Sequence, residues 1–270
     1  MRRGILAIPA ALMMVASVAA MTMPTPKAPK TYQEMSPAAR TAFVVERARR
    51  IGGDLRGDGQ PMEVSPELAA AIRIQLDGLV SERRTGDRAV TAILSRGIAN
   101  APVINAAFRA AKLPTSLGIA LAMSESEFSE CAVSPSGARG MFQFMPKTGE
   151  RFGLDPDGLC NVERSAAAAA SYHANLRSMF PGKSAGALVA ALAYNTGEKA
   201  AEAAFGDLAR RDDETAVARF WHIALTGTDS ANRMVLGTEG QAYLPRLFAC
   251  AIVAETPGAF GVTSSALSGL

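Results

Sequence analysis

The residues best suited to chemistry lie near the end of one predicted helix and in the loop after it. Glu125 and Glu127 follow an apolar run over residues 117–123. Because this run is apolar on nearly every side, we expect a buried helix that delivers a carboxyl group to the domain interior. A turn-rich segment, residues 134–140, and a second apolar segment, residues 141–145, come next. A carboxyl group buried beneath a glycine-containing loop suits acid–base chemistry.

Only one of the two glutamates is expected to act. Glycoside cleavage normally uses two carboxyl groups. Residues two apart in a helix, however, point about 200° apart around its axis, so Glu125 and Glu127 cannot face one substrate. We therefore predict that Glu127 is solvent-exposed and that Glu125 is a single catalytic acid.

A longer set of motif residues surrounds Glu125. It comprises Glu125-Ser126-x-Phe128 and Ser134-x-x-Gly137-Ala138-x-Gly140-Met141-Phe142-Gln143-Phe144-Met145-Pro146-x-Thr148-Gly149. This set resembles the signature of the lytic transglycosylases of glycoside hydrolase family 23, and it looks most like the membrane-bound lytic murein transglycosylase D type. The resemblance covers about Glu67 to Val262. It implies a mainly α, lysozyme-like fold (goose-lysozyme or SLT type) with at most a minor β element, preceded by extra N-terminal helices.

The resemblance implies a substrate and a mechanism. The substrate would be the glycan strands of peptidoglycan, cleaved at the β-1,4 bond between N-acetylmuramic acid and N-acetylglucosamine. One Glu suffices in this family because the substrate's N-acetyl carbonyl is thought to act as the nucleophile. Glu125 would protonate the glycosidic oxygen and then deprotonate the sugar's 6-hydroxyl, which closes a 1,6-anhydro ring. Burial beneath Met145 would raise the pKa of Glu125 and retain its proton near pH 7. No cofactor or metal is expected.

The family motifs also imply a set of substrate-binding residues. Read without the family, Ser134 is a turn-forming serine, Met145 core filler, Glu239 a helix cap and Tyr243 an ordinary packing aromatic. Gln143 is more informative, because a buried amide needs hydrogen-bond partners. The expected set is Ser134, Gln143, Met145, Tyr194, Asn195, Glu239 and Tyr243.

Two other functions stay open. A hydrolase resembling goose-type lysozyme would need a second carboxylate or a positioned water, and Glu150 or Asp155 could supply that carboxylate. A non-catalytic glycan-binding or scaffold protein could keep the same fold. Serine-hydrolase and metalloprotease classes are excluded because the sequence has neither Gly-x-Ser-x-Gly nor His-Glu-x-x-His. His173 and His222 are predicted to be surface or cap residues.

Composition narrows the fold and the partners. The 270 residues are 49% hydrophobic but only 6% aromatic, which favours packed helices. The net charge of +3 is small, and no lysine-rich stripe is interleaved with aromatic residues, so we expect no nucleic-acid partner. We expect a monomer, with cell-wall or secretion-machinery proteins left open as partners.

The three cysteines allow one disulfide and one free thiol. We favour Cys131–Cys160, since both should flank loops around the proposed site. Cys250 lies in an apolar segment and should behave as a small buried hydrophobe. No two cysteines have the spacing of metal ligands.

The N-terminus has the pattern of a secretory leader. Arg2 and Arg3 precede an apolar run over residues 5–18, and small residues allow cleavage after Ala20. We therefore expect export to the periplasm, with an uncleaved membrane anchor as the alternative. The expected divisions are a signal peptide at 1–20, a flexible linker at 21–35, a helical segment at 36–112, a catalytic domain at 113–262 and a polar tail at 263–270.

Helix signals divide the rest of the chain. Ser36-Pro37 and Ser65-Pro66 should begin helices, the first ending near Arg50 before Gly52 and Gly53. Further helices are predicted at 89–97, from Pro102 to about 111, at 162–179, at 184–194 and from Pro245 to about 255.

Overall fold

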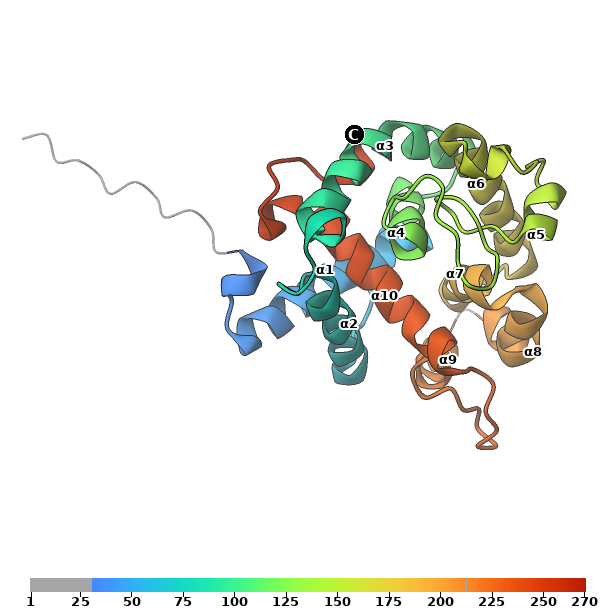
Figure 1. Cartoon of the computed structure of the whole chain (residues 1–270). Coiled ribbons are helices and arrows are strands. Elements are labelled where there is room, and N and C mark those ends of the chain that lie inside the picture. Colours follow the sequence, from blue (N-terminus) through green and yellow to red (C-terminus); the bar gives the residue numbers. More distant parts are fainter. Residues whose placement is uncertain (1–30, 212) are drawn as a thin grey trace, which may run out of the picture.

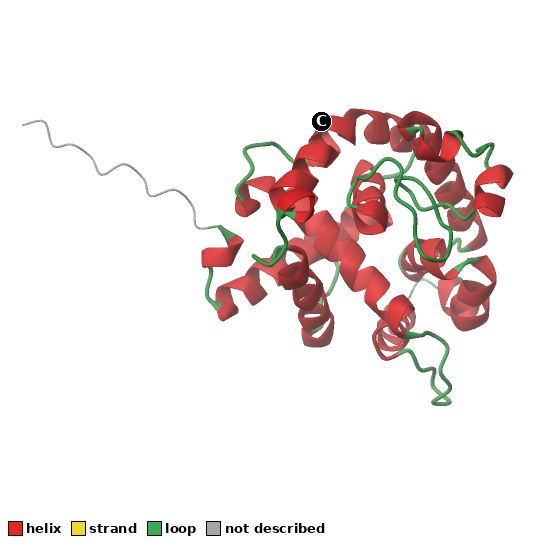
Figure 2. Ribbon diagram, in the orientation of Figure 1, coloured by secondary structure: helices red, strands yellow, loops and turns green. Residues whose placement is uncertain are grey.

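The computed structural model describes residues 31–211 and 213–270 (Figure 1). Within them ten α-helices pack around one core and no strand forms, apart from isolated bridges between residue pairs (Figure 2). The predicted mainly helical class, with extra N-terminal helices, is confirmed. The predicted signal peptide lies outside the described residues. The helices are α1 (Pro37–Arg56), α2 (Pro66–Leu79), α3 (Val90–Ala110), α4 (Thr115–Ser126), α5 (Pro146–Arg151), α6 (Val162–Met179), α7 (Ala185–Thr196), α8 (Glu198–Ala209), α9 (Glu214–Thr226) and α10 (Thr238–Glu255).

Helix α10 runs through the centre of the molecule. In Figure 1 it crosses between α1 and α2 on one side and α7 and α9 on the other, and it packs against all four and against α4. Residues 247–254 are all buried, because this part of α10 is covered on every side. Helix α4 lies between α10 and α3, and residues 116–123 are buried as predicted. The core therefore holds α4 and α10 against each other.

The first helix is longer than predicted. Helix α1 continues through Gly52 and Gly53 to Arg56, and Gly57 caps it in a left-handed conformation. A Cβ on Gly53 would lie 2.4 Å from the main-chain oxygen of Gln60. These two glycines therefore do not break the helix; they let the returning chain pass close to it.

Three further helix predictions need correction. Helix α3 is continuous across Pro102, which removes one main-chain hydrogen bond without ending the helix. Helix α10 begins at Thr238, well before the predicted start at Pro245. Helices α5, α8 and α9 had no predicted counterpart. Tertiary packing decides all three cases.

Both ends of the described chain are packed rather than free. Tyr32, within the predicted linker, is fully buried and donates a hydrogen bond to Asp77 Oδ1 at 2.9 Å. In the predicted polar tail Leu267 is fully buried, and Asn105 Nδ2 donates to its carbonyl oxygen at 2.8 Å. Residues 31–35 are thus part of the fold, and the tail is docked on α3.

His173 is buried in α6, so its prediction as a surface or cap residue is wrong, whereas His222 is exposed. Burial lowers the pKa of His173 to about 3, because desolvation penalises the charged imidazole. It is therefore neutral and acts in packing. Among the residues that the structure describes, no helix combines the length and apolar character needed to span a bilayer.

The docked tail predicts a stability effect. Leu267→Ala should lower the free energy of unfolding by about 2–5 kcal/mol, because it leaves a cavity where a leucine is fully buried. Leu270→Ala is the control, since Leu270 is 37% exposed, and it should cost well under half as much. Urea unfolding followed by circular dichroism measures both. Equal effects would show that the tail is not part of the core.

Candidate active site

A cleft of about 730 Å³ opens beside the C-terminal end of α4. Its walls come from α4, the 131–145 loop, α6, α7, α10 and the segment that leads into α10. All the predicted site residues line it except Tyr243, which lies behind Glu125. The lining includes Ser124, Glu125, Ser134, Gln143, Phe144, Met145, Tyr172, Tyr194, Asn195, Leu236, Glu239 and Arg246.

Glu125 lies in the last turn of α4, on the cleft wall. Tyr243, fully buried in α10, donates a hydrogen bond from its hydroxyl to Glu125 Oε1 at 2.8 Å. Desolvation raises the pKa of Glu125 to about 7, against the opposing effects of the Tyr243 hydrogen bond and the Arg246 charge; Glu239 adds a smaller increase. Glu125 can therefore both give and take a proton near neutral pH.

Met145 does not cover Glu125 in the way expected. It lines the cleft, but its side chain is 45% exposed. The desolvation instead accompanies the packing of α4 against α10, which brings the buried Tyr243 next to the acid, while the half-buried Tyr194 lies close enough to interact with its charge. Met145 forms part of the open margin of the cleft.

Glu127 is half-buried and paired, which corrects its prediction as a solvent-exposed residue. It ends α4 in a left-handed conformation (φ 54°). Its carboxylate forms an ion pair with Arg84, and its carbonyl oxygen accepts a hydrogen bond from Arg96 Nε at 3.1 Å. It is not among the residues that line the cleft. Glu125 and Glu127 therefore face different surroundings, as predicted. The reason differs from the predicted one, because Glu127 lies just beyond the end of α4 and not within the helix.

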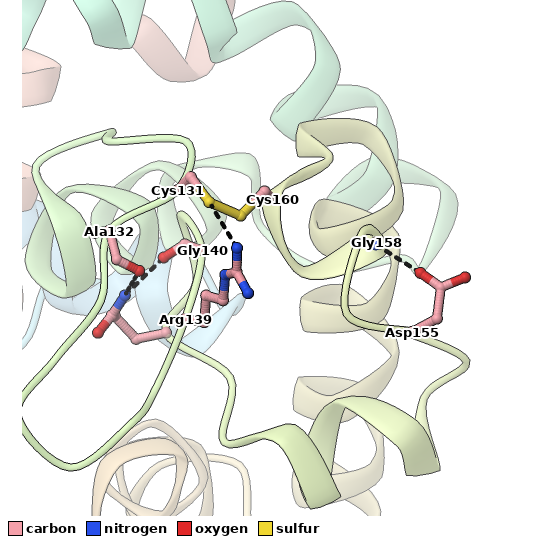
Figure 3. The surroundings of a disulfide bond; sticks show 8 residues. Cys131, Ala132, Arg139, Gly140, Asp155, Gly158 and Cys160 are labelled. Carbon is pink, nitrogen blue, oxygen red and sulfur yellow. Dashed lines mark hydrogen bonds between the residues drawn. A yellow bond between two sulfur atoms is a disulfide. The ribbon is translucent and has the colours of Figure 1, made fainter.

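The loop between α4 and α5 forms one wall of the cleft and is held internally. Gln143, at φ 48°, donates from Nε2 to the carbonyl oxygens of Gly140 at 2.8 Å and Ala132 at 3.1 Å (Figure 3). Ser134 Oγ accepts a hydrogen bond from Ala138 N at 3.0 Å. Gln143 has the partners that a half-buried amide needs. Ser134 both forms a turn and lines the cleft.

A disulfide joins Cys131 to Cys160 and fixes this loop to the start of α6, which is the favoured pairing (Figure 3). Arg139 lies against it, with its guanidinium 3.7 Å from Cys131 Sγ. Gly140, at φ 84°, passes so close to residue 159 that a Cβ would lie 1.8 Å from the Leu159 carbonyl oxygen. Cys250 is free and buried, as expected.

Aromatic residues form the opposite wall. Tyr194, near the end of α7, donates from its hydroxyl to the Phe142 carbonyl oxygen at 3.0 Å, which ties α7 to the loop. Its ring centroid lies 5.3 Å from that of Tyr172 and 6.3 Å from that of Phe144. Asn195 follows Tyr194 and is half-buried in the cleft.

The lining residues that sequence reasoning missed include Tyr172 and Arg246, both of which carry side chains that can contact a ligand. Tyr172 lies in an alanine-rich stretch of α6 and carries no motif signal. Arg246 follows Tyr243 by three residues, so helical periodicity places both on one face of α10. That spacing was the available signal for Arg246.

The carboxylates suggested as a second catalytic group lie elsewhere. Asp155 accepts a hydrogen bond from Gly158 N at 2.6 Å (Figure 3) and pairs with Arg164, while Glu150 is exposed; neither lines the cleft. Glu239 does line the cleft, at its exposed edge. In the described ranges no three His, Cys, Asp or Glu side chains are grouped to hold a metal ion.

The pKa of Glu125 predicts a pH-dependent stability. The folded state keeps a proton on Glu125 up to about pH 7, whereas the unfolded state loses it near pH 4.5, so this group stabilises the fold least at high pH. Glu125→Gln should remove this effect. Between pH 5 and pH 8, wild type should lose about 2–3 kcal/mol of unfolding free energy relative to the variant.

Urea unfolding at the two pH values measures this difference. Glu150→Gln, which alters an exposed carboxyl group outside the cleft, is the control and should follow wild type. A difference between wild type and Glu125→Gln that stays constant from pH 5 to pH 8 would contradict the burial of the acid.

A comparison with known protein families bears on this site. Residues 102–217 match the model of the Transglycosylase SLT domain, and no curated protein matches the chain. The matched segment runs from α3 into α9 and contains Glu125, the disulfide-linked loop and Tyr194. Tyr243 and Arg246 lie beyond it, on α10. Residues 102–217 are thus similar to a transglycosylase SLT domain, and this similarity suggests lytic transglycosylase activity on peptidoglycan.

Proposed function

We propose that the chain cleaves the β-1,4 bond between N-acetylmuramic acid and N-acetylglucosamine in peptidoglycan, and that it leaves a 1,6-anhydro-N-acetylmuramic acid end. Glu125 is the single acid and base. The observation that carries this proposal is the position of Glu125, in the cleft wall with a pKa of about 7 and a hydrogen bond from Tyr243. Among SLT proteins, the D type is the subtype we infer from the sequence motifs.

The first step uses the neutral form of Glu125. Because Oε1 accepts the hydrogen bond from Tyr243, the acid proton is carried by Oε2. That proton passes to the glycosidic oxygen as the bond to the anomeric carbon breaks. The acetamido oxygen of the same sugar attacks that carbon and closes a positively charged ring. The N-acetylglucosamine side departs as a neutral alcohol, and Glu125 is left as a carboxylate.

The second step returns the proton. The Glu125 carboxylate takes the proton of the sugar's 6-hydroxyl, whose oxygen attacks the anomeric carbon and reopens the acetamido ring. The product is the 1,6-anhydro sugar, and Glu125 is neutral again. Tyr243 and Arg246 stabilise the carboxylate between the steps, because both favour its charged form. No water is consumed.

The other cleft residues take separate roles in this proposal. The Asn195 amide, half-buried in the cleft, is suited to bind the acetamido group, and Ser134 lies on the opposite wall. The Gln143 amide nitrogen is already bonded to two carbonyl oxygens, so Gln143 shapes the loop instead of binding sugar through that nitrogen. Met145 offers apolar contact at the margin, and Glu239 a carboxylate at the exposed edge.

We infer that the chain acts in the periplasm, where peptidoglycan lies. The support is the leader pattern of residues 1–20, with Arg2 and Arg3 before an apolar run. Fractionation of cells that express the full chain tests this inference. Recovery in the cytoplasm would contradict it.

The reaction products test the proposal directly. Purified protein incubated with peptidoglycan sacculi should release muropeptides that lack one water, as measured by mass spectrometry. Glu125→Gln should lower the rate by about 10²–10⁴-fold, because an amide cannot serve as a general acid. Glu150→Gln should retain the wild-type rate.

The alternatives predict other results. Reducing-end products that depend on Glu239 would identify a hydrolase in which Glu239 activates water, and Glu239→Gln would then abolish activity. No release of muropeptides by the wild type would leave a non-catalytic glycan-binding protein. Either result would overturn the proposal.

Tyr243→Phe should change the pH profile of the reaction. The Tyr243 hydrogen bond lowers the pKa of Glu125, so its removal should raise that pKa. The alkaline limb of kcat/KM, where the acid loses its proton, should therefore shift to higher pH, while kcat at pH 7 falls because the carboxylate intermediate loses a donor. A lowered rate with an unmoved alkaline limb would show that Tyr243 serves only packing.

A further inference from the structure

Arg246 is a cleft residue with an assigned effect on the charge of Glu125 but with no assigned contact to the substrate. It lies on α10, one turn after Tyr243, and lines the cleft together with Glu125. Its guanidinium carbon is 5.6 Å from the centroid of the Tyr243 ring, so the planar group stacks beside the residue that holds the acid. Its charge reaches Glu125, whose pKa it lowers.

The charge of Arg246 is not balanced by an ion pair. Within residues 31–211 and 213–270, no carboxylate pairs with it, and its buried Nε has no hydrogen-bond partner. Arg40 and Arg56 also have an unpartnered Nε, but their other nitrogens reach Asp77 and Asp58. Arg47 shares the unpartnered Nε but does not line the cleft. Arg246 thus combines an unpaired guanidinium with access to the cleft.

Such a group has a chemical preference. A buried donor without a partner is destabilising, and a ligand oxygen that accepts its hydrogen bond removes that cost. A guanidinium binds a carboxylate through two parallel N–H···O bonds, and stacking on an aromatic ring orients its plane. Glu125 does not fill this role, because its carboxyl group accepts its hydrogen bond from the Tyr243 hydroxyl and, with a pKa of about 7, it is mostly neutral below neutral pH.

We propose that Arg246 binds a carboxylate of the glycan strand beside the bond that is cut. This inference rests on the proposed function, since it names the part of the substrate that the cleft recognises. Two sources share the chemistry. One is the lactyl carboxylate of N-acetylmuramic acid in strands without peptide, and the other is a carboxylate of the peptide stem. Arg246 is then a specificity residue that favours acidic glycans over neutral ones.

Glycan binding by the full chain tests the proposal. The chain carries Glu125→Gln so that ligands are not consumed, and calorimetry measures Kd for three tetrasaccharides. The first is N-acetylglucosamine tetramer, which has no carboxylate. The second alternates N-acetylglucosamine with N-acetylmuramic acid and has free lactyl carboxylates. The third carries L-alanyl-D-glutamate on those lactyl groups.

Arg246→Gln should raise Kd for an acidic tetrasaccharide at least about tenfold and change Kd for the neutral one less than about twofold. The acidic ligand that shows the loss identifies the source of the carboxylate. Arg246→Lys should recover part of the binding, because it keeps the charge but not the paired donors. Arg151→Gln is the matched control. Arg151 also lies 5.6 Å from an aromatic ring, that of Phe152, but it pairs with Glu198 outside the cleft lining.

Other outcomes overturn the proposal. Equal losses for neutral and acidic ligands would mean that Arg246 only maintains the fold of the cleft, and unchanged binding of both acidic ligands would mean that it contacts neither. In both cases the proposed function survives. Failure of the Glu125→Gln parent to bind any of the three glycans would overturn the proposed function and this inference together.

Discussion

One hydrogen bond joins the two helices on which the site depends. Tyr243 on α10 donates to Glu125 on α4, across 118 residues of sequence. Both helices run through the core, where residues 116–123 and 247–254 are buried throughout. The distance between phenol and carboxyl is therefore set by core packing and not by a surface loop. A shift of either helix would separate Glu125 from Tyr243, whose hydrogen bond lowers the pKa of Glu125.

The pKa of Glu125 results from opposing influences, and the proposed reaction needs both. Desolvation alone would hold the carboxyl group neutral and prevent it from acting as a base in the second step. Tyr243 and Arg246 restore part of the stability of the carboxylate. A single residue can then alternate between acid and base because neither form is strongly favoured at neutral pH. This balance explains why the site contains aromatic hydroxyls and an arginine around one carboxyl group.

The sequence was informative wherever a feature depends on local pattern. The buried character of α4 follows from its apolar run, and the starts of α1 and α2 follow from Ser-Pro caps. The cleft location of Gln143 and Tyr194 was predicted from the family motifs, because a resemblance to a family implies that family's fold and the positions of its motif residues. Such features require no knowledge of which distant segments meet.

Features that depend on distant partners could not be predicted in this way. Glu127 is half-buried, and its carboxylate pairs with Arg84, 43 residues earlier in the chain. Leu267 is buried because it reaches Gly97, where its side chain occupies the space that a larger residue would fill. The exposure of Met145 likewise depends on how far the loop wall extends over the cleft. Each of these depends on tertiary geometry that neighbouring residues do not specify.

The arrangement of α10 also explains why helices precede the matched domain. The match ends at residue 217, yet Arg246 lines the cleft from α10, and Tyr243 on the same helix donates a hydrogen bond to Glu125. A helix that presents one face to the cleft needs a partner on its other face, and α1 and α2 pack there, in the same core as α4 and α7. Residues 37–79 therefore do more than extend the chain. They support α10, whose Tyr243 donates the hydrogen bond to Glu125. A substitution in α2 that shifts α10 would therefore change the pKa of Glu125 without contacting the cleft.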